Sequence, residues 1–183
     1  MKPDILVAGI GNIFLGDDAF GVEVAQRLAC RELPAGVQVI DFGIRGFDLA
    51  FALMDDYGAV ILIDAVPRGE APGTLFTIEP DWDSLVSAGV EAHSMNPMKV
   101  LAMVKAMGGQ PKRILLVGCE PSPMPEDEER MGLSEPVERS LDQAVTIIET
   151  LIKQLQGEQH EWSMESDADH RGGGGCGYRI ARH

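Results

Sequence analysis

Residues 5–21 read ILVAGIGNIFLGDDAFG, and this stretch decides the fold class. The apolar run Ile5 to Gly9 predicts a short buried strand, and the glycines that follow it predict a tight turn. From Ala19 to Cys30 the apolar side chains recur at helical spacing. A buried strand, a turn and an amphipathic helix are together typical of the first unit of an α/β protein.

The same alternation continues along the chain. Further strands are predicted at 37–40, 59–63, 74–78 and 113–118, and further helices at 47–54, 97–107 and 134–155. The long strands are continuous aliphatic runs, as expected for parallel strands covered on both faces, whereas 74–78 alternates and is a candidate antiparallel strand. We therefore predict one three-layer α/β domain with a mostly parallel central sheet of about five strands and helices on both faces.

The composition changes after residue 156. Residues 157–183 contain little aliphatic material and carry four consecutive glycines at 172–175. We predict a domain at 1–156 and a flexible, Gly-rich C-terminal tail at 157–183.

Charge and composition exclude several functional classes. The chain has 29 acidic and 15 basic residues, a net charge of −14, which disfavours binding to nucleic acid and favours a metal ion or a cationic peptide segment. Three cysteines are too few for a disulfide framework. No apolar run approaches the ~20 residues that a membrane span needs, and the N-terminus lacks the form of a signal peptide. The expected location is the cytoplasm.

The glycine-rich turn does not fit a dinucleotide site. The G-x-G-x-x-G pattern requires a third glycine at position 14, where this chain has Phe14. Asp17 and Asp18 precede the helix and would oppose a pyrophosphate at its N-terminus. In a structural interpretation the glycines permit a tight turn and Asp17 caps the helix, but this leaves the second acid unexplained.

Polar side chains follow three of the predicted strands. Asn12, Asp17 and Asp18 follow the first strand, Asp41 the second and Asp64 the third. Ligand groups gather at the carboxyl ends of parallel strands, so these residues are candidates for a site. For Asp64, a structural role in capping a turn and a functional role are about equally supported.

Three of the four histidines lie after residue 156. A site within the predicted domain at 1–156 that needs an imidazole would therefore have to use His93. A lone loop histidine is more often an ordinary surface residue. Two of the strand-end carboxylates and the imidazole of His93 would nevertheless form an incomplete coordination set. Such a set suits Ni or Zn and leaves positions open for water or substrate. Neither an H-E-x-x-H nor a G-x-S-x-G motif is present.

Six segments in register resemble the hydrogenase maturation endopeptidases. They are residues 5–21, DFGIRG at 41–46, IDA at 63–65 with PGT at 72–74, His93, VGCEP at 117–121 and MGLSEPV at 131–137. The resemblance spans about residues 5–155. It implies a protease that removes the C-terminal extension of the large-subunit precursor of nickel–iron hydrogenase after nickel insertion.

The resemblance also implies which residues act. The family's metal-binding positions match Asp18, Asp64 and His93, which would serve a metal-assisted, aspartyl-type cleavage without a separate nucleophile. Asp17, Asp41 and Asn12 would support these ligands or position the substrate. Nickel would come from the substrate, Zn or Cd could occupy the site in vitro, and the protein is expected to be a monomer. The alternative function is a non-catalytic chaperone that senses or delivers nickel with the same three ligands.

Overall fold

The structure is a computed structural model that describes residues 4–82, 96–123 and 131–171, with side chains through residue 158. It contains one five-stranded sheet in the order β2-β1-β3-β5-β4. The strands are β1 (Ile5–Ile10), β2 (Val37–Gly43), β3 (Ala59–Ala65), β4 (Leu75–Ile78) and β5 (Ile114–Cys119). β4 pairs antiparallel with β5, and the other neighbours are parallel. The predicted mixed sheet is confirmed.

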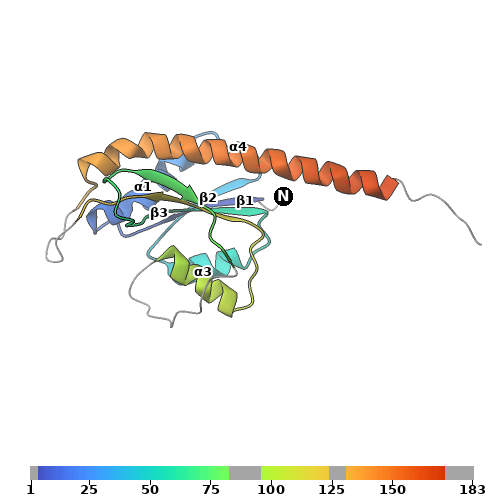
Figure 1. Cartoon of the computed structure of the whole chain (residues 1–183), viewed down its shortest axis with the longest axis horizontal. Helices are drawn as coiled ribbons and strands as arrows, with labels where there is room; N and C mark the ends of the chain where they lie inside the picture. The colour runs from blue at the N-terminus through green and yellow to red at the C-terminus, as the bar shows by residue number, and fades with distance from the viewer. Residues whose placement is uncertain (1–3, 83–95, 124–130, 172–183) are drawn as a thin grey trace, which may run out of the picture.

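The helices cover both faces of this sheet, as Figure 1 shows. A 3₁₀ turn, η1 (Gly16–Ala19), leads into α1 (Phe20–Ala29). The other described helices are α2 (Gly46–Leu53), α3 (Pro97–Ala106) and α4 (Glu135–Arg171). α1 and α4 pack on one face and α2 and α3 on the other, which gives the predicted three layers.

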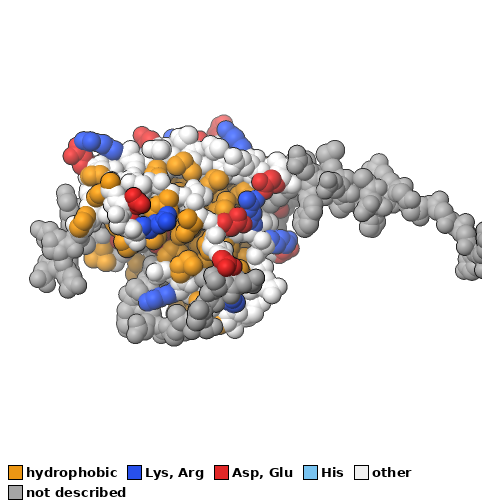
Figure 2. Space-filling view, in the orientation of Figure 1, with side chains coloured by type: hydrophobic (Ala, Val, Ile, Leu, Met, Phe, Trp, Pro, Cys, Tyr) orange, Lys and Arg blue, Asp and Glu red, His pale blue; other side chains and the backbone are white. Residues whose placement is uncertain are grey.

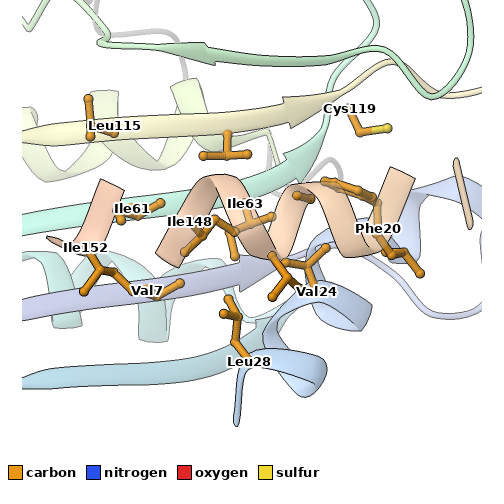
Figure 3. Packing of buried hydrophobic residues seen from close by; sticks show 14 of the residues in the cluster. Val7, Phe20, Val24, Leu28, Ile61, Ile63, Leu115, Cys119, Ile148 and Ile152 are labelled. Atoms are coloured by element: carbon orange, nitrogen blue, oxygen red, sulfur yellow. The ribbon is translucent and has the colours of Figure 1, made fainter. Parts of the chain in front are cut away.

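Two apolar cores explain why the central strands are aliphatic at nearly every position. Ile5 and Val7 of β1 pack with α1 and α4 in the cluster drawn in Figure 3. Leu6 and Ala8 of the same strand belong to the cluster under α2 and α3. Because successive side chains of a strand point to opposite faces, a strand covered on both sides must be apolar throughout.

Two strands extend further than the sequence pattern indicates. Asp41 pairs with Gly9 inside β2, and Asp64 pairs with Gly118 inside β3, so neither carboxylate follows its strand. The apolar pattern ends at these acids, but the backbone ladder continues past them. The strand ends predicted at 40 and 63 are therefore early by three and two residues.

α4 also continues past its predicted end near Leu155, to Arg171. It passes through Gly157 and extends beyond the body of the domain in Figure 1. A single glycine costs a helix only about 1 kcal/mol relative to alanine, so Gly157 does not stop it. The predicted tail therefore begins as helix at 157–171, while residues 172–183 lie outside the described part of the chain.

The surface is mixed in character. In Figure 2, acidic and basic side chains lie near one another around the body, and hydrophobic side chains gather between α4 and α3. Salt bridges join Arg27 to Asp142 and Arg31 to Glu149, linking α1 and the residues just after it to α4. Within the described ranges, no helix combines the length and the apolar character needed to cross a membrane.

Candidate functional site

Glycines bring η1 and the start of α1 onto the sheet. A Cβ on Gly21 would lie 2.1 Å from the carbonyl oxygen of Ile63 in β3 and 2.3 Å from that of Ile10 in β1. Gly11 has φ +136°, and a Cβ there would lie 1.7 Å from the backbone oxygen of Asp18. The glycines thus do more than permit a turn: they let the backbone carrying Asp18 approach the end of β3.

Asp18 lies half-buried at this junction. Its Oδ2 accepts a hydrogen bond from the backbone N–H of Asn12 at 2.7 Å. Burial raises the pKa of the Asp18 carboxyl, and the Asn12 N–H opposes this only in part. The Asp18 carboxylate is therefore held against the loop after β1.

Asp64 is the second carboxylate of the pair and is only 3% exposed. Its Oδ1 accepts a hydrogen bond from the N–H of Ala65 at 2.9 Å. The pKa of Asp64 lies well above its usual value, first because of burial and second because of the negative charge of Asp18; the Ala65 N–H lowers it less. The structure thus brings Asp18 and Asp64 close enough to repel one another.

The third predicted ligand, His93, lies outside the described residues. Within 4–82, 96–123 and 131–158, no group of three or more His, Cys, Asp or Glu side chains is arranged to hold a metal ion. The donor chemistry of the Asp18–Asp64 pair still suits a divalent cation, because two anionic oxygen donors in mutual repulsion are stabilised by a positive charge. Any third protein ligand must come from elsewhere in the chain.

Asp17 is engaged differently from its neighbour. Its Oδ1 accepts a hydrogen bond from the N–H of Ser134 at 2.5 Å, and its Oδ2 accepts from Ser134 Oγ at 2.7 Å and from the N–H of Ser122 at 2.8 Å. Neither η1 nor α1 has a side-chain cap, so the interpretation of Asp17 as a helix cap is wrong. This buried carboxylate instead joins η1 to the segment after β5 and to the start of α4.

Asp41 lies on the other side of the sheet from Asp64. Val37 and Val39, which share its face of β2, pack against the α1–α4 core, whereas Leu62, which shares the face of Asp64, packs under α2 and α3. The Asp41 Oδ2 accepts a long hydrogen bond, 3.4 Å, from Nε2 of Gln26 in α1. Its predicted supporting role stays a prediction.

Asn12 organises the loop after β1. Its Oδ1 accepts a hydrogen bond from the N–H of Phe14 at 3.0 Å, and its backbone oxygen accepts from the N–H of Leu15 at 3.0 Å. With its own N–H bound to Asp18, Asn12 fixes both the loop and the orientation of that carboxylate.

One buried acid was not among the candidates from the sequence. Glu120 follows β5 directly, so the rule that selected Asp64 could have found it. It accepts hydrogen bonds from the N–H groups of Arg68 at 2.6 Å and Gly69 at 3.2 Å. Burial would raise the pKa of Glu120, but the N–H groups of Arg68, Gly69 and Glu70 outweigh it and lower the pKa. Glu120 therefore holds the loop between β3 and β4.

Large apolar side chains are exposed in the loops beside the carboxylate pair. Phe14 is 61% exposed in the loop after β1, and Ile44 is 62% exposed after β2. These two loops are adjacent, since the N–H of Gly11 donates to the oxygen of Gly43. The exposed large apolar side chains of these two loops and of α2, which follows the second loop, are Ile13, Phe14, Leu15, Ile44, Phe47 and Phe51. We call these six residues the apolar surface; such patches mark interaction sites.

Comparison with known proteins shows which family the chain resembles. Residues 22–151 match the family model described as hydrogenase maturation protease. The chain is 31% identical to the hydrogenase 2 maturation protease of Escherichia coli, over 77% of this chain and 85% of that protein. It is 38% identical to the hydrogenase expression/formation protein HupD of Rhodobacter capsulatus, over 66% of this chain and 59% of that protein.

A solved structure shares the fold. The hydrogenase maturating endopeptidase HybD from E. coli superposes with a TM-score of 0.67 and 29% identity, covering 84% of this chain and 93% of that one. The family model, the sequence relatives and this structure agree, so the chain belongs to the hydrogenase maturation protease family and is a peptidase.

Proposed function

We propose that this peptidase removes the C-terminal extension of a nickel-loaded large-subunit precursor of nickel–iron hydrogenase. The observation that carries the proposal is the Asp18–Asp64 pair. Among the described residues each of the two carboxylates accepts one backbone hydrogen bond, the negative charge of Asp18 raises the pKa of Asp64, and both lie at the carboxyl edge of the sheet.

In this proposal Asp18, Asp64 and His93 bind the nickel ion that the precursor carries. The Asp64 carboxyl, whose pKa is raised by burial and by Asp18, becomes fully ionised when a cation relieves the repulsion. A bound divalent ion supplies Lewis-acid polarisation of a carbonyl or lowers the pKa of a water, without a protein nucleophile. Because the ion arrives with the substrate, cleavage waits for nickel insertion.

The apolar surface supports a peptide substrate. Phe14 and Leu15 lie in the same loop that places Asn12 and Asp18, so a chain reaching the carboxylates passes beside exposed apolar side chains. A peptide segment can bury these apolar side chains, whereas a metal ion alone makes no apolar contact with them. Replacing Phe14 and Phe47 with Ser is therefore expected to raise KM for the precursor about 10-fold, the effect of losing roughly 1.4 kcal/mol of apolar contact.

The decisive experiment compares two forms of the precursor. Purified protein is mixed with nickel-loaded or nickel-free large-subunit precursor, and loss of the C-terminal peptide is followed by mass spectrometry. We expect cleavage of the nickel-loaded form alone. Nickel-dependent binding without cleavage would identify a chaperone instead, and cleavage of both forms would refute recognition through nickel.

His93→Ala tests the third ligand in the same assay, with His160→Ala as the matched control. We expect His93→Ala to abolish cleavage with little change in melting temperature, and His160→Ala to cleave at the wild-type rate. Wild-type cleavage by His93→Ala would remove His93 from the site.

A further inference from the structure

Adjacent acids in η1 make contacts in opposite directions. Asp18 contacts the preceding loop, through the N–H of Asn12. Asp17 contacts segments more than a hundred residues later, through Ser122 and Ser134. The four-residue turn η1 is therefore held from two sides by consecutive side chains.

The contacts of Asp17 form a closed arrangement. Ser122 Oγ donates to Ser134 Oγ at 2.8 Å, and Ser134 Oγ donates in turn to Asp17 Oδ2 at 2.7 Å. The backbone N–H groups of both serines also donate to this carboxylate. Hydrogen bonds to a charged acceptor are among the stronger ones in proteins, and here both the Asp17 and the Ser134 side chains are buried.

The need for such an anchor follows from the elements that carry the two carboxylates. Asp64 lies in β3, which is paired on both sides and cannot move easily. Asp18 lies in a short 3₁₀ turn that has no side-chain cap, and 3₁₀ geometry is weaker than α-helical geometry. The position of the Asp18 carboxylate relative to Asp64 therefore depends chiefly on the contacts that hold η1 against the sheet.

We propose that Asp17 is a positioning residue: by anchoring η1 to Ser122 and Ser134, it holds the Asp18 carboxylate against Asp64. The proposal rests on the proposed function, in which this pair binds the cation. Groups that orient metal ligands typically change metal affinity or activity by 10- to 100-fold when they are removed.

The test replaces Asp17 with Ala and follows two readouts. Amide hydrogen exchange at Asn12 reports the position of Asp18, because that N–H is held by Asp18 Oδ2. Calorimetry with Ni²⁺ alone reports the pair as a cation site. We expect Asp17→Ala to speed exchange at Asn12 at least 10-fold and to weaken Ni²⁺ binding about 10- to 100-fold.

A matched control separates positioning from general destabilisation. Ile152 packs α4 against the sheet far along the helix from Ser134, so Ile152→Val or Ile152→Ala is chosen to give the same loss of melting temperature. The control is expected to retain wild-type exchange at Asn12 and wild-type Ni²⁺ affinity. Equal behaviour of Asp17→Ala and this control in both readouts would overturn the proposal.

Milder variants cover the case in which Asp17→Ala does not fold. Asp17→Asn loses an acceptor for at least one of the serine N–H groups, and Ser134→Ala loses only the hydroxyl contact. Effects on Asn12 exchange should rank Asp17→Asn above Ser134→Ala, and the reverse ranking contradicts the proposal. If wild-type protein neither binds Ni²⁺ nor cleaves precursor, the proposed function fails, while Asn12 exchange still decides whether Asp17 positions Asp18.

Discussion

Two pairs of acids at the carboxyl edge of the sheet have opposite surroundings. Asp17 accepts three hydrogen bonds and Glu120 accepts at least two, nearly all from backbone N–H groups of other segments. Within the part of the chain that the structure describes, Asp18 and Asp64 accept one backbone hydrogen bond each, and the charge of Asp18 acts against ionisation of Asp64. We call the first pair the anchoring acids and the second the repelling acids.

The difference teaches how one residue type performs two tasks in one place. A carboxylate whose oxygens are occupied by N–H donors is stable as an anion and fixes the loops that supply the donors. A buried carboxylate with few donors beside a like charge is stable only when it is protonated or when a cation arrives. Among the described residues, the number of hydrogen-bond donors, rather than the distance from the strand end, distinguishes Asp17 and Glu120 from Asp18 and Asp64.

Both pairs of acids depend on the close contact between η1 and the sheet. The largest effect is therefore expected from Gly21→Val, which would disrupt this contact. The new side chain would overlap the carbonyl oxygens of Ile10 and Ile63, which are backbone atoms that cannot move aside. We expect a loss of about 3 kcal/mol or more in the free energy of unfolding, measured by urea denaturation. Gly157→Ala is the control: the added Cβ would meet no other group within 4 Å, and a gain of about 0.5–1 kcal/mol is expected. Wild-type stability of Gly21→Val would refute the close approach.

Neutralising the repelling acids should remove function without removing the fold. For Asp18→Asn with Asp64→Asn, we expect cleavage to fall by more than about 100-fold, beyond the usual effect of groups behind a ligand. The melting temperature without metal should stay the same or rise, because a repulsion has been removed. Added Ni²⁺ should raise the melting temperature of wild type but not of this variant.

A control for charge alone is Asp142→Asn with Glu149→Gln, which removes two acids on α4 that pair with Arg27 and Arg31. This control should keep both cleavage and the nickel response. Marked destabilisation of the Asp18–Asp64 variant in the absence of metal would instead make the repelling acids structural.

Neutralising an anchoring acid should have the reverse effect. Glu120→Gln places an amide against the N–H groups of Arg68 and Gly69, where one donor can no longer be satisfied. We expect a lower urea midpoint than wild type, whereas Asp64→Asn alone should leave the midpoint unchanged or raise it. The two single variants measured side by side test the comparison, and a shift of the same sign in both would contradict it.

The smallest effect is expected in the pH dependence of stability without metal. Because the pKa of Asp64 is raised, the folded chain holds more protons than the unfolded chain between pH 3.8 and that raised pKa, so stability falls as pH rises through this window. Because the pKa of Glu120 is lowered, its contribution is present above pH 4.5 and is lost as pH falls through the folded pKa. Urea titrations in chelator should show that Asp64→Asn flattens the first slope and Glu120→Gln the second. An unchanged slope in Asp64→Asn would deny that Asp64 titrates abnormally.

The sheet could be predicted because its signal is local. Continuous apolar runs indicate strands covered on both faces, and the alternating run at 74–78 correctly predicts the antiparallel strand β4. Element ends are less well predicted. The apolar pattern ends at Asp41 and Asp64, but backbone pairing continues through both, and α4 continues past Gly157.

The candidate site could be predicted only in part. The rule that ligand groups gather at the carboxyl ends of parallel strands selected Asp18 and Asp64. In the structure the two lie close enough for the charge of Asp18 to raise the pKa of Asp64. The same rule could not distinguish Asp17 from Asp18, because the hydrogen-bond donors to Asp17 belong to Ser122 and Ser134, which are 105 and 117 positions away. Such long-range contacts leave no trace in the spacing of nearby residues. The role of His93 stays a prediction.

The length of α4 has a practical consequence for labelling this protein. Ser134 and Glu135 lie at the anchored end of the helix, whereas Gly157 is exposed and a Cβ added there would meet no other group within 4 Å. At 1.5 Å per residue, Gly157 is about 33 Å along the helix from Glu135. A fluorophore or surface tether attached at Gly157→Cys, with Cys30 and Cys176 replaced, would thus be carried on a rigid arm pointing away from the carboxylates. Such a conjugate leaves the proposed site at Asp18 and Asp64 unobstructed for a large protein substrate.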